Sequence, residues 1–349
     1  MSDRLNFAFI GCGEIAVHTS NSVLESQHAR VVRCMDVRED VAADLAGRHD
    51  APHSTDLDDV LNDDDVQAVI IPTPHFQHAP LSIAAARAGK HVLVEKPMAC
   101  TLTEADEMIA AADAAGVKLG VLLPMRLGFA YAKARELVAA GAVGSVVAYK
   151  IHAMSCKPEH YWHGGYTGRV KDDWRIGLAT SGGGYLIMNQ IHNLDSMVSV
   201  IDPHPERIYA EYSTLNTAAP IEVEDFISFV MRLAGGAVVS LDGSSAAAGA
   251  ESFGDRVYGT KGQIAVNNSL RVFLDEPWGE IPAGEWTDLP APEGGPNSRT
   301  SYVDAFAEAV LNDAAPPVDG REGRRSLEIA RGAYLSMQRG APVAFPVAE

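Results

Sequence analysis

Cysteine is scarce in this chain of 349 residues, which contains Cys12, Cys34, Cys100 and Cys156 and no others. None of the four forms a C-x-x-C pair, and four scattered thiols do not make a disulfide framework. A reducing compartment fits this usage best. The first expected strand starts near Leu5, which leaves no room for a signal peptide. We therefore expect a cytoplasmic protein.

Long apolar runs and basic residues are also in short supply. No stretch of about 18 residues is apolar and uncharged, so we expect no membrane span. The 28 Lys and Arg residues stand against 46 Asp and Glu residues, which gives a formal net charge of −18. A surface this acidic repels phosphate backbones, so we expect no nucleic-acid partner. Hydrophobic residues make up 47% of the chain, which is typical of a folded globular protein and not of a disordered one.

Strand and helix patterns alternate through the first 122 residues. The expected strands are Leu5–Ile10, Val31–Asp36, Val66–Ile71, His91–Val94 and Val117–Leu122, and the expected helices are Glu14–Glu25, Arg38–Arg48, His78–Ala88 and Glu104–Ala115. Strands that alternate with helices of this length indicate βαβ units and a parallel sheet covered on both faces.

After Pro124 the pattern changes to runs of strands with few helices. Strands are expected over 145–153, 207–213, 225–233, 237–243, 256–259, 263–266 and 271–274, and helices over 130–140, 185–201, 302–311 and 323–338. Residues 277–297 and 313–320 are rich in Pro and Gly and are expected to be loops. This pattern favours a second, α+β domain with a largely antiparallel sheet. We expect domains at 1–123 and 124–349.

The clearest local motif is the run from Gly11 to Ala16, which reads G-x-G-x-x-A between an expected strand and an expected helix. Gly11 permits the tight turn, and Gly13 lets the backbone approach a pyrophosphate. The helix then begins at Glu14, and the free N–H groups of its first residues, Glu14 and Ile15 among them, point at the phosphates. The motif therefore predicts a dinucleotide site.

Asp36 lies 23 residues after Gly13, at the end of the second expected strand. A carboxylate there accepts hydrogen bonds from the ribose hydroxyls and repels a 2′-phosphate, so it favours NAD over NADP. Val37 and Arg38 follow it, and Arg38 keeps NADP open because an arginine can accommodate that phosphate.

Further segments extend the pattern over most of the chain. They are Ile71-Pro72-Thr73-Pro74 with His78, the run AGKHVLVEKP at 88–97, Trp174-Arg175, Gly182-Gly183-Gly184, His192-x-x-Asp195 and Gly259-Thr260-Lys261-Gly262. Together with the glycine turn and Asp36, they resemble the Gfo/Idh/MocA-type oxidoreductases, the family of glucose–fructose oxidoreductase and inositol 2-dehydrogenase. AGKHVLVEKP is the most specific of these elements.

The resemblance implies a fold, an activity and partners. The fold is an N-terminal Rossmann domain with a doubly wound parallel sheet, followed by a substrate-binding domain with a large, mostly antiparallel open sheet. That sheet implies a homodimer or homotetramer. The activity is hydride transfer between a nicotinamide and a carbinol carbon of a sugar, polyol or glycoside. The cofactor-binding residues it adds are Thr73, Pro74, His78, Glu95, Lys96, Trp174 and Arg175.

Lys96 follows an expected strand, at the edge where open parallel sheets bind ligands. Its ammonium could stabilise the developing alkoxide, whereas the alternative reading is a surface ion pair with Glu95. The Lys96–Pro97 bond is a candidate for the cis form. His192 is the candidate general base, and Asp195, on the same helical face, could orient its ring. The alternative is a buried structural histidine.

The sequence departs from the family at Met188, where many members carry an aspartate four residues before the histidine. A thioether handles no proton, so Lys96 and His192 must do so, or Tyr185 or Asn189 shares the role. Besides Lys96, the expected substrate-binding residues are Arg126, His152, His163, Arg175, Asn189 and His192.

Aromatic and polar residues are dense from His152 to Trp174, which favours a polyhydroxylated substrate because rings stack on sugar faces. His160 and His163 lack a third ligand at the usual spacing, so we expect no metal site. Two other functions remain open from the sequence. One is an enzyme that cleaves glycosides through a transient keto-sugar and recycles NAD, and the other is a non-catalytic dinucleotide-sensing regulator.

Overall fold

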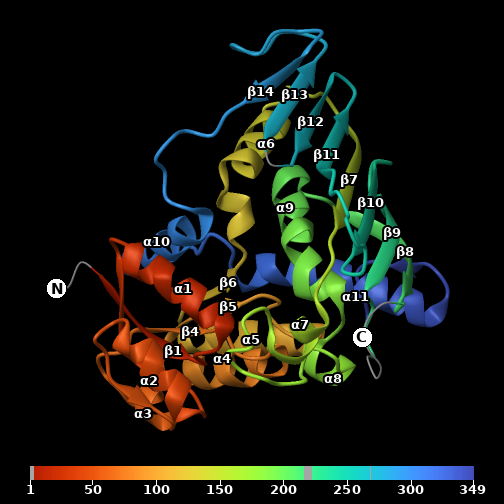
Figure 1. The fold of residues 1–349 in the computed structure, drawn as a ribbon. Coiled ribbons are helices and arrows are strands. Elements are labelled where there is room, and N and C mark those ends of the chain that lie inside the picture. Colours follow the sequence, from red (N-terminus) through yellow and green to blue (C-terminus); the bar gives the residue numbers. More distant parts are fainter. Residues whose placement is uncertain (1–3, 216–221, 268) are drawn as a thin grey trace. The chain divides into compact units, whose positions relative to one another are not determined.

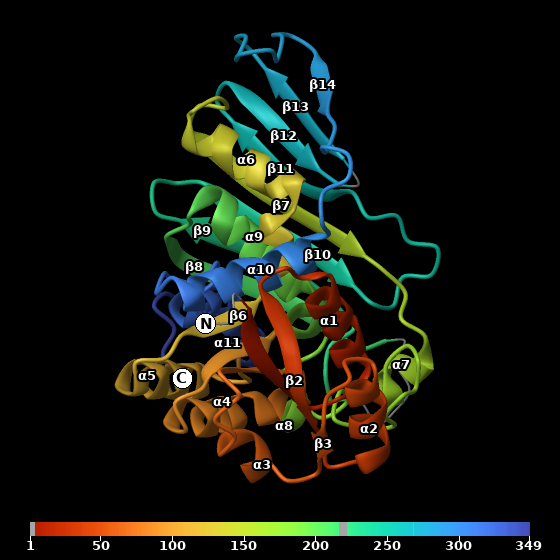
Figure 2. The ribbon, with the colours of Figure 1, turned by 90° about the vertical axis from the view of Figure 1, so that its left-hand side faces the viewer.

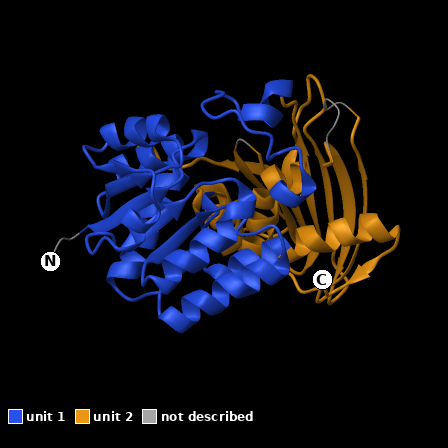
Figure 3. Cartoon of the chain, turned by 90° about the horizontal axis from the view of Figure 1, so that it is seen from below, with its two compact units in different colours: residues 1–124, 158–182, 296–327 blue, residues 125–157, 183–295, 328–349 orange. Residues whose placement is uncertain are grey.

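The computed structural model describes residues 4–215, 222–267 and 269–349. It divides into two compact units (Figure 3). Unit 1 contains residues 1–124, 158–182 and 296–327, and unit 2 contains residues 125–157, 183–295 and 328–349. The expected boundary after residue 123 lies one residue from the first break. The return of 158–182 and 296–327 to the N-terminal unit was not expected.

Unit 1 is built on a six-stranded parallel sheet with the order β3-β2-β1-β4-β5-β6 (Figures 1 and 2). Its strands are β1 (Leu5–Ile10), β2 (Ala29–Met35), β3 (His53–Ser54), β4 (Ala68–Ile71), β5 (His91–Glu95) and β6 (Leu119–Leu122). All of its pairings are parallel. The predicted Rossmann sheet is therefore confirmed, and the order reverses between β1 and β4, where such sheets bind ligands.

Helices connect and cover these strands. They are α1 (Glu14–Glu25), α2 (Glu39–Gly47), α3 (Asp58–Leu61), α4 (His78–Arg87), α5 (Leu102–Ala115), α7 (Glu159–Gly164), α8 (Leu178–Ser181) and α10 (Ser298–Leu311), with a 3₁₀ turn η1 (His75–Gln77). Every residue of β4 and β6 is buried, as the continuous apolar runs predicted. α5 begins earlier than expected because Thr101 and Glu104 form a capping box.

Unit 2 contains a nine-stranded, mostly antiparallel sheet with the order β14-β13-β12-β11-β7-β10-β9-β8-β15. The strands are β7 (Val146–Met154), β8 (Pro205–Ser213), β9 (Phe226–Leu233), β10 (Val238–Ser244), β11 (Gly254–Gly259), β12 (Gly262–Val266), β13 (Leu270–Leu274), β14 (Trp286–Leu289) and β15 (Val343–Ala344). Within this nine-stranded sheet, β7 and β10 are the only described strands that pair in parallel. β14 lies inside the segment 277–297, which was wrongly expected to be a loop.

The helices of unit 2 include α6 (Phe129–Ala139) and α9 (Ile191–Ile201), preceded by the 3₁₀ turn η2 (Pro124–Leu127) and the π-helix η3 (Leu186–Gln190). The expected helix over 185–201 is thus a π-helical turn followed by an α-helix. α11 (Gly320–Arg339) starts within the residues of unit 1 and ends within those of unit 2.

Two buried carboxylates fix the η3–α9 segment within unit 2. Glu224 accepts hydrogen bonds from the backbone N–H groups of Gly184 (2.6 Å) and Leu186 (2.8 Å) and from the Tyr334 hydroxyl (3.0 Å). Glycine is required at 184, because an added Cβ would lie 2.1 Å from the Glu224 carbonyl oxygen. Burial raises the pKa of Glu224 to about 7. The carboxylate therefore holds the start of the segment at a cost in desolvation.

Asp255 holds the same segment further along. It accepts hydrogen bonds from the hydroxyls of Tyr149 (2.8 Å) and Tyr131 (3.1 Å) and from the Asn193 side-chain amide (3.0 Å). Burial raises its pKa to about 6, although the three donors oppose the rise. Asn193 in α9 is thereby tied to β11 and β7.

The raised pKa of Glu224 predicts a pH-dependent stability. From its ordinary pKa of 4.5 up to about 7, the folded state keeps a proton that the unfolded state releases, so stability falls as pH rises through this range. The full difference corresponds to roughly 3 kcal/mol. Glu224→Gln removes this titration. We expect the wild type to lose more stability than the variant between pH 5 and pH 8.

Thermal midpoints of both proteins across this pH range measure the effect. Glu211→Gln, on the exposed face of β8, is the matched control and should keep the wild-type pH profile. Parallel profiles for the wild type and Glu224→Gln would contradict the assignment.

Candidate functional site

The glycine turn between β1 and α1 has the shape that a pyrophosphate requires. Gly11 has φ +99°, and an added Cβ would lie 2.7 Å from the Thr73 side chain. At Gly13 an added Cβ would meet nothing within 4 Å. The turn is closed against Thr73 and open beside the first turn of α1. These residues therefore fit a dinucleotide, whose phosphates would face the N–H groups at the start of α1.

Asp36 is bonded to this turn. Its Oδ2 accepts the backbone N–H of Cys12 at 2.7 Å, and its Oδ1 accepts the N–H of Arg38 at 2.9 Å. The Arg38 guanidinium is paired with Asp40, with its Nε 3.1 Å from Oδ1. Val37, which lies between Asp36 and Arg38, is 83% exposed. Both oxygens of the Asp36 carboxylate are therefore held by backbone N–H groups, and the Arg38 guanidinium forms a surface ion pair with Asp40.

His78 joins the loops that follow β4 and β5. Its Nδ1 lies 2.7 Å from the carbonyl oxygen of Pro97, and its Nε2 lies 3.0 Å from that of Thr73. The ring is completely buried, which lowers its pKa. The sequence placed His78 against the cofactor. In the structure the ring holds the Pro72–Pro74 loop to the loop that carries Lys96, and its contact with the cofactor stays a prediction.

Lys96 follows β5 at the carboxyl edge of the parallel sheet, and the Lys96–Pro97 bond is cis, as anticipated. The preceding Glu95 is almost completely buried. One of its oxygens accepts the Lys96 backbone N–H (3.2 Å), and the other accepts bonds from Arg299 (2.5 Å) and Thr19 (3.3 Å). The Glu95 side chain therefore fixes the backbone at Lys96, and its contact with the cofactor stays a prediction.

Residues 158–182 supply the aromatic part of unit 1. The Trp174 ring lies 4.4 Å from the ring of His75, and the Arg175 guanidinium lies 4.5 Å from Trp174 and 5.2 Å from Tyr161. Tyr161 and Trp162 are buried against each other, so these rings support the segment and do not line an open surface for a sugar. Nδ1 of His163 binds Asp173 at 2.6 Å.

His75 is a site residue that the sequence reasoning missed. Its Nδ1 lies 2.8 Å from the Ser181 carbonyl oxygen, so this nitrogen carries the proton in the neutral ring and Nε2 is an acceptor. Burial holds the pKa of His75 well below its usual range, and the nearby His78, Lys96 and Arg175 add to the effect. The signal that could have identified it is that the run from Thr73 to His78 contains a histidine at position 75 as well as His78.

In unit 2, η3 and α9 carry Asn189, His192 and Asp195. Asp195 is completely buried, and its two oxygens accept bonds from Nε (2.9 Å) and Nη2 (2.5 Å) of Arg126. The sequence predicted that Asp195 orients His192 and that Arg126 binds substrate. The structure shows a buried two-point ion pair between them, which ties α9 to η2.

Two polar side chains beside His192 have buried oxygen atoms without a hydrogen-bond partner. They are Oδ1 of Asn189 and Oε1 of Gln190. Buried polar atoms are normally satisfied, so each of these oxygens is a candidate acceptor for a ligand hydroxyl or a water. Met188, which replaces the family aspartate, is 2% exposed.

His152 lies away from this helix. Asp255 accepts hydrogen bonds from Asn193 of α9 and from the Tyr149 hydroxyl, so Tyr149 and Asp255 lie on the face of the sheet toward α9. Side chains alternate between the two faces along β7. His152 therefore points to the opposite face, where its ring lies 4.7 Å from that of Phe253. That His152 binds substrate stays a prediction, and the alternation of side chains along β7 argues against it.

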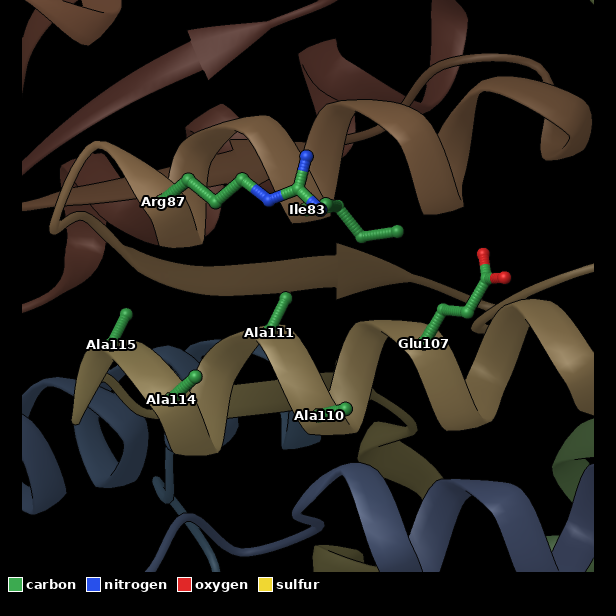
Figure 4. A pocket seen from close by; sticks show the side chains of 7 residues that line it. All are labelled: Ile83, Arg87, Glu107, Ala110, Ala111, Ala114 and Ala115. Atoms are coloured by element: carbon green, nitrogen blue, oxygen red, sulfur yellow. The ribbon is translucent and has the colours of Figure 1, made fainter.

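A separate groove in unit 1 lies between α4 and α5 (Figure 4). Alanines line most of it, with Arg87 and Glu107 at its sides, so it offers little chemistry for a reaction. No group of three or more potential metal ligands occurs among the residues that the structure describes, and the cysteines there form no disulfide. In the same described part of the chain, none of the helices has the length and hydrophobicity of a membrane span.

Comparison with known proteins bears on both units. Residues 5–123 match the family model described as oxidoreductase family, NAD-binding Rossmann fold, and residues 131–265 match the model of the GFO/IDH/MocA C-terminal domain. The 1,5-anhydro-D-fructose reductase of Ensifer adhaerens is 28% identical over 329 residues, which cover 92% of each chain.

Solved structures agree with this. GenD2 from gentamicin A biosynthesis, in complex with NAD, is 27% identical with a TM-score of 0.83 and covers 99% of this chain and 98% of its own. Levoglucosan dehydrogenase in complex with NADH and levoglucosan shares the fold, with a TM-score of 0.87, 22% identity and coverage of 99% and 100%. The chain belongs to the Gfo/Idh/MocA family of oxidoreductases and has its NAD-binding Rossmann domain.

Proposed function

We propose that this protein is an NAD-dependent dehydrogenase that acts on a carbinol carbon of a sugar, polyol or glycoside, with Lys96 and His192 handling the proton. The observation that carries the proposal is the placement of Lys96 at the carboxyl edge of the NAD-binding sheet, fixed by the buried Glu95–Arg299 pair. The names of the relatives support the substrate class, since one reduces 1,5-anhydro-D-fructose and another was solved with levoglucosan.

Each residue of the candidate site has its own role in the proposed hydride transfer. When bound, NAD supplies the hydride acceptor. The Lys96 ammonium donates to the substrate oxygen and stabilises the charge that develops on it. His192 accepts the hydroxyl proton, and the unpartnered oxygens of Asn189 and Gln190 accept bonds from further hydroxyls. Arg175 and Trp174 position the nicotinamide end of the cofactor.

The experiment that tests this function is a screen of NAD⁺ reduction across sugars, inositols and glycosides, followed at the nicotinamide absorbance. Net NADH formation with a member of these classes supports the proposal. Cleavage of a glycoside without net NADH would identify the recycling enzyme instead, and tight NAD binding without turnover on any alcohol would identify a sensor.

Lys96→Ala is expected to lower kcat at least about a hundredfold, on the scale of removing a key electrostatic donor, and to leave NADH affinity nearly unchanged. Steady-state kinetics on a substrate from the screen and NADH fluorescence titration measure the two effects. Lys118→Ala is the matched control, because Lys118 precedes β6 at the opposite edge of the same sheet and pairs with Asp313. An active Lys96→Ala enzyme would remove the assigned role.

Asp36→Ala is expected to relax the preference for NAD, since it removes the carboxylate that would repel a 2′-phosphate. The ratio of NADH to NADPH dissociation constants measures this without a substrate. Asp64→Ala, in an exposed loop, should keep the wild-type ratio. An unchanged ratio in Asp36→Ala would show that the ribose contact lies elsewhere.

We further propose that the protein forms a homodimer or homotetramer through the open face of the nine-stranded sheet. The neighbouring residues Tyr209 and Val230 on this face are 40% and 54% exposed. Val230→Glu is expected to reduce the mass in solution to that of a monomer, as measured by light scattering on a sizing column. Asn62→Glu, at an exposed position of unit 1 away from this sheet, adds the same charge and is the control. A monomeric wild type would refute the assembly.

A further inference from the structure

Residues 158–182, here named the strap, are bonded to the dinucleotide-binding part of unit 1 through Arg169. Its Nε donates to the carbonyl oxygen of Cys12 at 2.9 Å, and its Nη2 donates to the carbonyl oxygen of Val41 at 3.2 Å. Its Nη1 pairs with Asp44 at 2.8 Å. One guanidinium therefore links the strap to the glycine turn and to α2.

The contact with Cys12 is central, because Cys12 is the middle residue of the Gly11–Gly13 turn. Its N–H is held by Asp36 and its carbonyl by Arg169. The group that would bind the ribose and the arginine of the strap thus bond to the same residue. No sequence pattern connected Arg169 with the turn, and it was expected only among the polar residues around a substrate.

A second anchor lies at the first turn of α1. The Tyr166 backbone N–H donates to Oε2 of Glu14 at 2.9 Å. Gly165 has φ +74°, a conformation that favours glycine, and an added Cβ would lie 2.0 Å from the same oxygen and displace the Glu14 carboxylate. Glu14 was predicted to contact the cofactor, and in the structure its carboxylate binds the strap.

A third anchor lies at the nicotinamide end. The Ser181 carbonyl binds His75, and Trp174 lies against the same ring. The strap is therefore fixed at the loops after β1 and β4 and at α2, which together form the carboxyl edge where a dinucleotide lies.

We propose that the strap is a clasp that retains NAD on unit 1 and that Arg169 closes it. A bound dinucleotide would lie between the turn and the strap, so its departure requires the Arg169 contacts to break. The Arg169 side chain is only 19% exposed, which limits screening of its bonds to Asp44 and the two carbonyls. The inference rests on the NAD-binding domain and not on the identity of the substrate.

The test is the rate of NADH release from the holoenzyme, measured by stopped-flow fluorescence after mixing with excess NAD⁺. We expect Arg169→Ala to raise this rate about tenfold or more, on the scale of losing charge-assisted hydrogen bonds. Arg48→Ala is the matched control, because Arg48 also approaches Asp44, at 3.4 Å, and makes no contact with the turn. Its release rate should stay within about twofold of the wild type.

A release rate for Arg169→Ala within twofold of the wild type would overturn the clasp. An equal acceleration in Arg48→Ala would also overturn it, since the effect would then come from the charge of Asp44. If Arg169→Ala does not fold, hydrogen exchange of the wild type decides. Saturating NADH should slow exchange of the amides of residues 165–175, and unchanged exchange there contradicts the proposal. Failure of the substrate screen would leave this test intact.

Discussion

The buried ion pair between Glu95 and Arg299 is the interaction on which the position of Lys96 depends. A carboxylate with 3% of its side chain exposed is costly to desolvate, and loss of one partner in such a pair costs about 3–5 kcal/mol. Glu95 recovers this cost by accepting bonds from Arg299, Thr19 and the backbone of Lys96. The backbone of Lys96, the proposed proton donor, is therefore fixed by the preceding carboxylate.

Unit 2 uses the same physical device around His192. Asp195 is bound at two points by Arg126, Asp255 holds the neighbouring Asn193, and Glu224 holds the start of the segment. The raised pKa values of Glu224 and Asp255 show what this costs, because both are held in surroundings that favour the protonated form. Asp195 is bound by a cation, whereas Glu224 and Asp255 accept bonds from neutral N–H and hydroxyl groups. These carboxylates therefore serve to position the η3–α9 segment more than to stabilise the fold.

The sequence predicted the contacts between residues that are close in the chain and missed those between residues that are far apart. The glycine turn and Asp36 lie within one βαβ unit, so local spacing was sufficient. Glu95 and Arg299 are 204 residues apart, and Arg169 and Cys12 are 157 apart. Such pairs leave no periodic signal, so Glu95 was assigned to the cofactor and Arg169 to the substrate. For His152 the limit is different, since the register of β7 decides which face of the sheet it occupies, and the sequence does not give that register.

The net charge of −18 affects how the protein binds an anionic cofactor. NAD is an anion, and a strongly acidic protein slows the approach of anions through its long-range field. Affinity must then come from short-range donors and from slow release. The N–H groups at the start of α1 provide the donors, but Glu14 at the same turn adds negative charge. The strap binds the Glu14 carboxylate through the Tyr166 N–H and places the Arg169 cation beside Cys12, which offsets part of that charge. A cofactor held in this way is better suited to many turnovers without exchange than to rapid equilibration with the pool.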